Sequence, residues 1–548
     1  MSTEYFLRQN EISSRSDIFS IARATIETAF YGNNVQKVTS LSEAYKLAKA
    51  SPGTIALDMD VCRPKELGLA DGTKVLLFND GEVTGRASAA RKIIGEPGVD
   101  TAALMGIIRE AVYKTRYKKL YHSQVYIGLH PDFMVKANLL IPEGEENILY
   151  SWLLNFQHIN EEYTKLYNRS VPFNEGDIYV FSDPTWYSPD YPMGLTCFDP
   201  KHNCAAILGM RYFGEHKKGT LTLAWSIANR NGFVACHGGQ KRYNLGDRSF
   251  VAGVFGLSGS GKSTITHAHH NDRYNITVLH DDAFVISAGD ASSIALEPAY
   301  FDKTQDYPIG SPDNVYLLSV QNNGATMDLN GKITLVAEDI RNGNGRAVKS
   351  RLWSPNREDK FAEAANAIFW LMKDPTMPPV LKIKDHMLAS VMGLCLATIR
   401  TSAERLAEGV DPDALVFEPY ANPFRAYPLA EDYAKFKHLF EIRSLDCYIL
   451  NTGKFMGKKV TPEVTLGILE KIVDRAADFK PWHNFTDIEI MPVEGFEADL
   501  SDEKYKLLFK NNMLNRVNFI KSRETAKDGY DRLPAEAAAA IEKVISEI

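Results

Sequence analysis

The sequence predicts an α/β protein with two main domains, a P-loop mononucleotide-binding domain and a mixed α/β domain that precedes it. One observation is an apolar run, residues 250–255, that leads directly into Gly256-Leu-Ser-Gly-Ser-Gly-Lys-Ser263. A second is the strand-like run 276–280, which ends in Asp281-Asp282. A third is the length of 548 residues, which is enough for two or three domains with sizeable cores.

The segment 256–263 fits the pattern G-x-x-x-x-G-K-[ST] in the strand–loop–helix context that this pattern requires. Its glycines allow backbone N–H groups to turn inward around phosphate oxygens, and a helix start adds a favourable dipole. We expect Lys262 to reach the β- and γ-phosphates and the Ser263 hydroxyl to hold a divalent metal. The predicted nucleotide contacts are Gly256, Leu257, Ser258, Gly259, Ser260, Gly261, Lys262, Ser263 and Thr264. A phosphate loop alone names no reaction.

The composition excludes several classes of function. Apolar residues make up 45% and charged residues 24%, as in an ordinary soluble globular protein. The formal net charge of −7 gives no electrostatic reason to expect nucleic acid, and no Lys/Arg run indicates a membrane surface. The most apolar stretch, 388–399, is too short to span a bilayer. The six cysteines include no C-x-x-C pair, which argues against a disulfide framework or a thiolate zinc site. The N-terminus lacks a signal-peptide pattern, so we expect a cytoplasmic protein.

The polar, Gly-rich stretch 238–248 is predicted to be a break between domains. The expected division is an N-terminal mixed α/β, substrate-side domain (1–245), a nucleotide-binding catalytic domain with a lid (246–480) and a mostly helical C-terminal extension (481–548).

Hydrophobic periodicity predicts the main elements. The expected strands are 74–78, 177–181, 221–227, 233–237 and 276–280, and residues 181–200 are expected to form an ordered loop. The expected helices are 18–30, 361–372, 385–408, 430–441, 462–477 and a packing helix that begins at Pro534.

Asp281-Asp282 ends its strand some twenty residues after the phosphate loop. A nucleotide-binding site places a second metal ligand there, because both groups lie at the carboxyl edge of one sheet. The alternative is a strand-terminal turn with two solvated acids. Beside a phosphate loop, the metal interpretation is favoured.

Lys218 and His237 have ordinary interpretations, a solvated surface lysine and a structural histidine. With Asp282 they also offer N, N and O ligands, which suit a first-row metal such as manganese. A ligating lysine must be neutral, which requires burial near a cation. Composition and spacing leave both interpretations open.

Nine segments, taken in chain order from about residue 80 to 475, resemble the ATP-dependent phosphoenolpyruvate carboxykinases. The family's motifs and the matching residues are T-G-R (84–86), Y-A-G-E-M-K-K-G (212–219), G-L-S-G-T-G-K-T-T (256–264), I-G-D-D (279–282), C-Y-A-K-T (300–304), N-T-R-V-S-Y-P (344–349, in part), L-P-P-V (378–380), F-G-A-P-F (421–424) and V-N-T-G (450–453). The ordered set is specific, although the single short matches are not.

The resemblance implies a manganese ion held by Lys218, His237 and Asp282, which coordinates the oxyanion of oxaloacetate and the enolate left by loss of CO2. It also implies that Arg86 clamps the substrate carboxylate, with Tyr212 at its edge. A Lewis acid stabilises the anion that decarboxylation creates.

On the nucleotide side, the resemblance implies that Ser263 binds a magnesium ion carried by ATP, with Asp281 close to it. Lys303 and Arg346 would neutralise charge on the transferring phosphoryl group. The catalytic residues implied in this way are Lys218, Ser258, Lys262, Lys303 and Arg346, and the substrate-binding residues are Arg86, Tyr212, Lys218 and Arg346. Ser260 stands where the GTP-dependent relatives have cysteine, which favours ATP over GTP.

The chain departs from the family's pattern at three places that bear on the substrate. The lid segment S-R-L-T is here 381–384, the E-H-G-W after the paired aspartates is 283–286, and the S-P-K-D-K after T-G-R is 87–91. The leading hypothesis is conversion of oxaloacetate and ATP to phosphoenolpyruvate, ADP and CO2. One alternative is a kinase with another acceptor, because 281–286 also resembles the D-D-A-V of HPr kinases. A third is a catalytically idle ATP-binding regulator.

Overall fold

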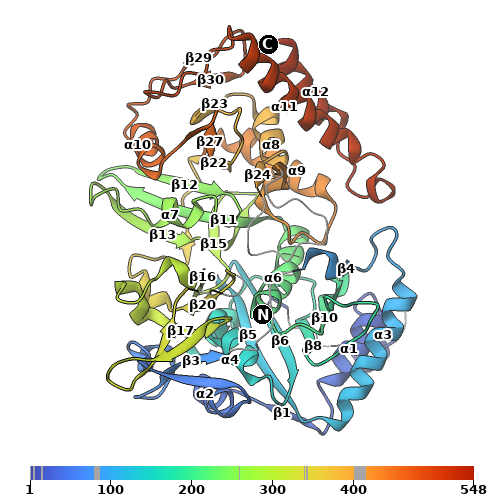
Figure 1. Ribbon diagram of the computed structural model, residues 1–548. Coiled ribbons are helices and arrows are strands. Elements are labelled where there is room, and N and C mark those ends of the chain that lie inside the picture. The colour runs from blue at the N-terminus through green and yellow to red at the C-terminus, as the bar shows by residue number, and fades with distance from the viewer. Residues whose placement is uncertain are drawn as a thin grey trace. The chain divides into compact units, whose positions relative to one another are not determined.

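The computed structural model describes residues 2–548 except 4–6, 14–15, 79–86, 258, 339, 341–342 and 400–414. The described chain forms two compact units, drawn in Figure 1. The first unit holds the residues up to Ile227 together with Leu296–Pro355, and the second holds Ala228–Ala295 and the described residues from Asn356 onward. The predicted domain boundaries at 245 and 480 stay predictions. The two units are divided after Ile227, Ala295 and Pro355.

A mixed sheet forms the centre of the first unit, with strand order β1-β5-β6-β8-β10-β9-β4. Its strands are β1 Val35–Lys37, β5 Leu120–His130, β6 Phe133–Pro142, β8 Ile178–Asp183, β10 Cys204–Leu208, β9 Leu195–Asp199 and β4 Arg91–Ile93, and β7 Gln157–His158 pairs with β5. The helices α1 Ile21–Ala29 and α3 Thr101–Lys114 bury Ile26 and Ile108 against Phe181 of this sheet. Ser20 starts α1, because its side chain accepts a hydrogen bond from the Arg23 backbone N–H at 2.9 Å.

A second sheet of the first unit has the order β16-β20-β17-β3-β2. Its strands are β16 Tyr300–Lys303, β20 Arg346–Lys349, β17 Leu317–Gln321, β3 Lys74–Phe78 and β2 Thr54–Asp60, and the hairpin β18 Gly324–Met327 with β19 Ile333–Val336 follows β17. The remaining helices of this unit are α2 Leu41–Ala50, α4 Glu146–Asn155 and α5 Glu161–Asn168, and α6 Phe213–Arg230 runs to its end.

The second unit is built on a sheet of order β21-β15-β14-β11-β12-β22-β26-β23-β30-β29. These strands are β21 Lys360–Phe361, β15 Ser293–Ala295, β14 Ala283–Ser287, β11 Phe233–Asn244, β12 Ser249–Phe255, β22 Ala367–Met372, β26 Asp446–Asn451, β23 Val380–Ile383, β30 Ile488–Ile490 and β29 Lys480–Pro481, and β13 Asn275–His280 pairs with β11. The central strands β12, β22 and β26 are parallel to one another. Their carboxyl ends therefore meet at one edge of the sheet, where α/β proteins bind ligands.

The helices of the second unit are α7 Lys262–His267, α8 His386–Leu394, α9 Leu429–Arg443, α10 Pro462–Val473, α11 Glu503–Ser522 and α12 Ala535–Ser546. Two short strand pairs complete it, β24 Ala397–Ile399 with β25 Leu415–Phe417 and β27 Lys454–Phe455 with β28 Lys458–Lys459. α10 covers the sheet through Leu469, which packs with Val254 and Phe369 in one core. In the described part of the chain, every helix is too short or too polar to cross a bilayer.

A fully buried ion pair joins α11 to the end of β22. Arg516 Nη2 lies 2.7 Å from Asp374 Oδ2, and neither side chain is exposed. Asn512 Nδ2 donates to the other carboxylate oxygen at 3.0 Å, as does the Thr376 hydroxyl at 2.8 Å. These contacts satisfy both carboxylate oxygens, which lowers the cost of burying the pair, whereas the buried Arg516 Nε has no hydrogen-bond partner among the described residues. Figure 1 shows α11 and α12 side by side at the C-terminal end of the chain.

Several sequence predictions agree with these elements, and others do not. The strand predicted at 221–227 is wrong, because these residues lie in α6, where both faces are buried and the helical period is lost. The helix predicted at 361–372 is wrong, because this stretch contains β22, a strand buried on both faces with a continuous apolar run. Residues 238–244 of the predicted break belong to β11, and the domain boundary predicted there stays a prediction. The helix predicted at 385–408 ends at Leu394, and residues 400–408 lie outside the described chain.

We expect Arg516→Met to lower the free energy of unfolding of the second unit by about 3–5 kcal/mol, because it leaves the buried Asp374 carboxylate without its charge partner. Denaturant unfolding of the full chain measures this loss. The matched control is Lys521→Met on the same helix, whose pair with Glu542 is half exposed and should contribute about 0–1 kcal/mol. Equal effects of the two substitutions would contradict the anchoring role of Arg516.

Candidate functional site

The predicted phosphate loop connects β12 to α7 in the second unit. Gly259 and Gly261 have φ angles of +78° and +91°, in the left-handed region that glycine enters without strain. The Ser260 backbone N–H donates to the Leu257 carbonyl at 3.0 Å, which closes a tight turn. Ser258 lies outside the described residues.

Gly256 makes room for this turn. A Cβ at Gly256 would lie 2.3 Å from Ser260 Oγ and 2.9 Å from Leu371 Cβ, so no larger residue fits. Leu257 and Ser260 are buried, whereas Ser263 and Thr264 are exposed at the start of α7. The loop thus turns over the end of β22, with its two polar helix-start side chains left accessible.

The glycines of the supposed break have a packing reason. A Cβ at Gly239 would lie 2.0 Å from Thr266 Oγ1, and one at Gly238 would lie 2.8 Å from the Val254 carbonyl oxygen. Both glycines are inside β11, so they allow α7 and β12 to approach this strand closely. The Gly-rich signal therefore marks close approach of the phosphate-loop helix rather than a linker.

The far end of α7 is held by a buried lysine. Lys241 Nζ donates to the Ile265 carbonyl at 2.6 Å and to the Ala268 carbonyl at 3.3 Å, which satisfies the helix C-terminus. The same nitrogen lies 3.1 Å from His270 Nε2, and His270 Nδ1 lies 3.0 Å from a Glu470 oxygen. Burial lowers the pKa of Lys241 to about 7.

Lys262 links the loop to the paired aspartates. Its Nζ donates to the Asp281 carbonyl and lies 3.6 Å from Asp282 Oδ1. The Asp282 carbonyl in turn accepts the Gly238 N–H at 3.1 Å, beside the pairing of His237 with Ala283. The connection between β13 and β14, residues 281–282, is thereby fixed next to the first turn of α7.

His237 lies beside Asp282, which belongs to the connection between β13 and β14. Its Nε2 is 3.1 Å from Asp282 Oδ1, and the Phe424 ring packs edge-on against the imidazole. Its Nδ1 contacts the Ala421 carbonyl, which can only accept, so Nδ1 carries a proton and Nε2 is the atom turned to the carboxylate. The backbone at this carbonyl is in the left-handed region, with φ angles of 55° at Ala421 and 52° at Tyr420. A neutral imidazole nitrogen and a carboxylate oxygen are both donors that manganese accepts, so these two residues fit a metal.

Asp281 has a different environment from Asp282. Its Oδ2 lies 3.5 Å from His267 Nε2, one helical turn beyond Ser263. Burial alone would raise the pKa of Asp281, but the neighbouring His267 and Lys262 hold it well below its usual range. The carboxyl group is therefore ionised at neutral pH.

The first unit carries Tyr212, directly before α6, and Lys217 and Lys218, which lie within α6. Tyr212 is buried with its ring 6.3 Å from the Phe301 ring, and Lys217 forms a fully buried ion pair with Glu297 at 2.9 Å. Lys218 is partly buried, with Nζ 5.7 Å from the Trp225 ring centroid. Of the predicted manganese ligands, His237 and Asp282 are thus together in the second unit, and Lys218 belongs to the first.

Lys303 and Arg346 are also brought together in the first unit. They lie directly opposite each other in the antiparallel pair of β16 and β20. Arg346 is buried, and its Nη1 donates to the Gly345 carbonyl at 3.1 Å. Burial raises the pKa of the nearby Asp306, although Lys303 and Arg346 oppose the shift. The two cations predicted to face the phosphoryl group therefore occupy one local site.

Two further points concern the predicted site: one predicted residue is not described, and the described residues offer no additional metal-ligand cluster. Arg86 and the T-G-R motif lie outside the described residues. The described residues contain no group of three His, Cys, Asp or Glu side chains placed to hold a metal. Sequence reasoning missed Glu297, His267 and the Ala421 carbonyl, because no local pattern marks a partner that is distant in the chain.

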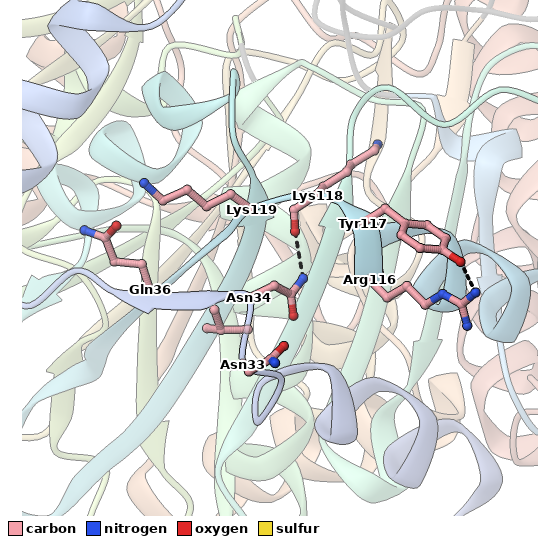
Figure 2. A pocket seen from close by; sticks show the side chains of 8 residues that line it. Asn33, Asn34, Gln36, Arg116, Tyr117, Lys118 and Lys119 are labelled. Carbon is pink, nitrogen blue, oxygen red and sulfur yellow. Dashed lines mark hydrogen bonds between the residues drawn. The ribbon is translucent and has the colours of Figure 1, made fainter.

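A surface pocket of about 340 Å³ in the first unit is unrelated to the predicted site residues. Figure 2 shows its lining, which includes Asn34, Arg116, Lys118 and Lys119. The Lys118 amine is already paired with Asp183 at 3.0 Å, and Asn34 Nδ2 donates to the Lys118 carbonyl at 2.7 Å. None of the predicted catalytic side chains lines this pocket.

Comparison with known proteins decides the family. The family model for phosphoenolpyruvate carboxykinase matches residues 64–494, which is most of the chain. The chain belongs to the phosphoenolpyruvate carboxykinase family. The resemblance expected from the motifs is therefore confirmed, as is the mixed α/β fold class.

Relatives named phosphoenolpyruvate carboxykinase (ATP) are similar at low identity. The chain is 26% identical over 309 residues to that of Aeropyrum pernix, covering 53% of this chain and 60% of the relative. It is 25% identical over 214 residues to that of Dictyostelium discoideum, covering 35% and 36%. It is 24% identical over 453 residues to that of a Staphylococcus aureus strain, covering 73% and 76%. The chain thus spans less than two thirds of the first two relatives' length.

We expect Gly239→Ala to destabilise the second unit by about 1–3 kcal/mol and to weaken ATP binding, because the added methyl group pushes α7 away through Thr266. Adding Thr266→Ala should recover part of both losses. Gly467→Ala on α10 is the control, since nothing lies within 4 Å of its Cβ position and helix propensity should add about 0.5–1 kcal/mol. Denaturant unfolding and calorimetric titration measure these effects. Unchanged ATP affinity in Gly239→Ala would contradict the close-approach role.

We expect the stability of the wild-type chain to rise with pH relative to Lys241→Met. Between the folded pKa of about 7 and the unfolded value near 10.5, the unfolded state binds the extra proton, so unfolding becomes more costly as pH rises. The expected slope difference is roughly 1.4 kcal/mol per pH unit, measured by denaturant unfolding from pH 7 to 9.5. Parallel curves for the two proteins would show that Lys241 is charged in the folded state throughout.

Proposed function

We propose that this chain is an ATP-dependent phosphoenolpyruvate carboxykinase, which converts oxaloacetate and ATP to phosphoenolpyruvate, ADP and CO2. The observation that carries the proposal is the convergence of His237, Asp282 and Lys262 beside the phosphate loop. A phosphate loop serves many reactions, but a histidine held beside the second aspartate suits stabilisation of an enolate. Family membership supports the same reaction.

The phosphate loop and its cations would carry the phosphoryl-transfer half of the reaction. We assign the β- and γ-phosphates to Lys262 and the amides of residues 256–264. Lys303 and Arg346, paired across β16 and β20, would face the transferring group and neutralise charge on its oxygens. Placing several cations at one phosphoryl group favours the transition state, where that charge is spread over three oxygens.

Two divalent metals complete the proposal. Lys218, His237 and Asp282 would hold manganese, and Ser263 with Asp281 close to it would hold the magnesium of the nucleotide. Manganese bound there would supply a Lewis acid for the oxyanion of the substrate. The protein's part is to present His237 Nε2, with the ring held through Nδ1 by the Ala421 carbonyl, next to Asp282 Oδ1. Lys218 can join only as a neutral amine.

The substrate end is assigned to Arg86 and Tyr212, with Ser258 nearby. A guanidinium group binds a carboxylate through two parallel hydrogen bonds, so Arg86 would orient oxaloacetate as well as attract it. A cytoplasmic location, and no nucleic acid or membrane as partner, stay predictions from composition.

Phosphorus NMR tests the proposal. Wild-type protein with oxaloacetate, ATP, Mg²⁺ and Mn²⁺ should form phosphoenolpyruvate, and Lys218→Ala should lower the rate by about 10²–10⁴-fold by removing a ligand beside the reacting oxygen. Lys114→Ala, an exposed lysine paired with Glu110 on α3, is the control and should keep the wild-type rate.

Two other outcomes would overturn this proposal. ATP turnover without phosphoenolpyruvate would indicate a kinase with another acceptor, as the likeness to HPr kinases suggests. ATP binding without turnover of any acceptor would indicate an idle regulator.

A further inference from the structure

The nucleotide-binding edge of the second unit is formed by three parallel strands, β12, β22 and β26. β12 leads into the phosphate loop, and β26 leads into Asn451-Thr-Gly453. The strand between them, β22, ends at Met372, and the next residue is Lys373. Because the strands are parallel, all three ends lie on the same edge of the sheet.

The Lys373 side chain lies against the phosphate loop. Its Nζ is 3.9 Å from the position that a Cβ on Gly259 would occupy, and apart from Gly259 and its two chain neighbours no other described residue comes within 4 Å of that position. Gly453 packs on the other side, where an added Cβ would lie 3.1 Å from Lys373 Cα. The Lys373 backbone N–H donates to the Ala397 carbonyl at 3.0 Å, which fixes the base of the side chain.

The charge on Lys373 has no partner among the described residues. The side chain is half-buried, and burial lowers its pKa. The adjacent carboxylate, Asp374, faces the core and is committed to Arg516. Lys262, by contrast, already contacts the Asp281 carbonyl and lies near Asp282. A half-buried cation without an anion is unfavourable, so an anion bound over the loop would improve its environment.

We propose that Lys373 binds the polyphosphate of a nucleotide held by residues 256–263, as a second cation beside Lys262. The proposal rests on the proposed ATP-dependent function and deepens it. Lys373 lies against the loop at Gly259, and this loop is assigned to the phosphates of the nucleotide. We therefore expect Lys373 to recognise the phosphate chain and to favour ATP and ADP over AMP.

Calorimetric titration with ATP, ADP and AMP in the presence of Mg²⁺ tests this role. Lys373→Met should bind ATP and ADP about 10- to 100-fold more weakly, and AMP less than about threefold more weakly, because a charge-assisted contact to the outer phosphates is lost. Lys373→Arg should retain most of the affinity for ATP. The control, Lys471→Met on the exposed face of α10, removes the same charge and should stay within about twofold of wild type.

The outcomes separate this inference from the function on which it depends. If the wild type binds ATP and Lys373→Met binds it equally well, the role of Lys373 is overturned and the proposed function stands. If the wild type binds none of the three nucleotides, the proposed function is overturned as well. Equal weakening of ATP and AMP, with a lower unfolding temperature in the absence of nucleotide, would show that Lys373 only supports the fold of the loop.

Discussion

The hydrogen bond from Lys262 to the Asp281 carbonyl joins the two halves of the candidate site in the second unit. It ties the start of α7 to the connection between β13 and β14, residues 281–282, and that connection positions Asp282 beside His237. The contact is possible only because Gly238 and Gly239 let β12 and α7 lie close to β11. A phosphate loop and a candidate metal pair are thus parts of one packed structure, and a shift in α7 would move both.

The buried lysines show how differently one residue type can be used. Lys217 and Lys349 are fully buried beside Glu297 and Asp302, at 2.9 Å and 2.8 Å, so each pair is locally neutral. Lys241 has no acid at its amine and satisfies helix carbonyls instead. Lys373 has neither kind of partner among the described residues. This difference in pairing, rather than position alone, distinguishes structural lysines from one poised for an anion.

The sequence predicted those parts that depend on local pattern. The glycines at 259 and 261, the strand before them and the periodic helices at 429–443 and 462–473 follow from neighbouring residues. It failed where burial on all sides removed the period, as in α6 and β22. It also missed the Ala421 carbonyl that fixes His237, because a backbone partner 184 residues away leaves no mark on local sequence. No local pattern marks Lys373, because its neighbours Gly259 and Gly453 lie in the segments that follow two other strands.

The ion pair between Asp374 and Arg516 has a consequence for the order in which the protein is made. Its two members are 142 residues apart, and the carboxylate belongs to the turn that follows β22, directly after Lys373. A ribosome delivers Asp374 first, so in a nascent second unit this carboxylate lacks its charge partner until α11 has emerged. The turn after β22, at the edge that is expected to receive the nucleotide, is therefore completed late in translation.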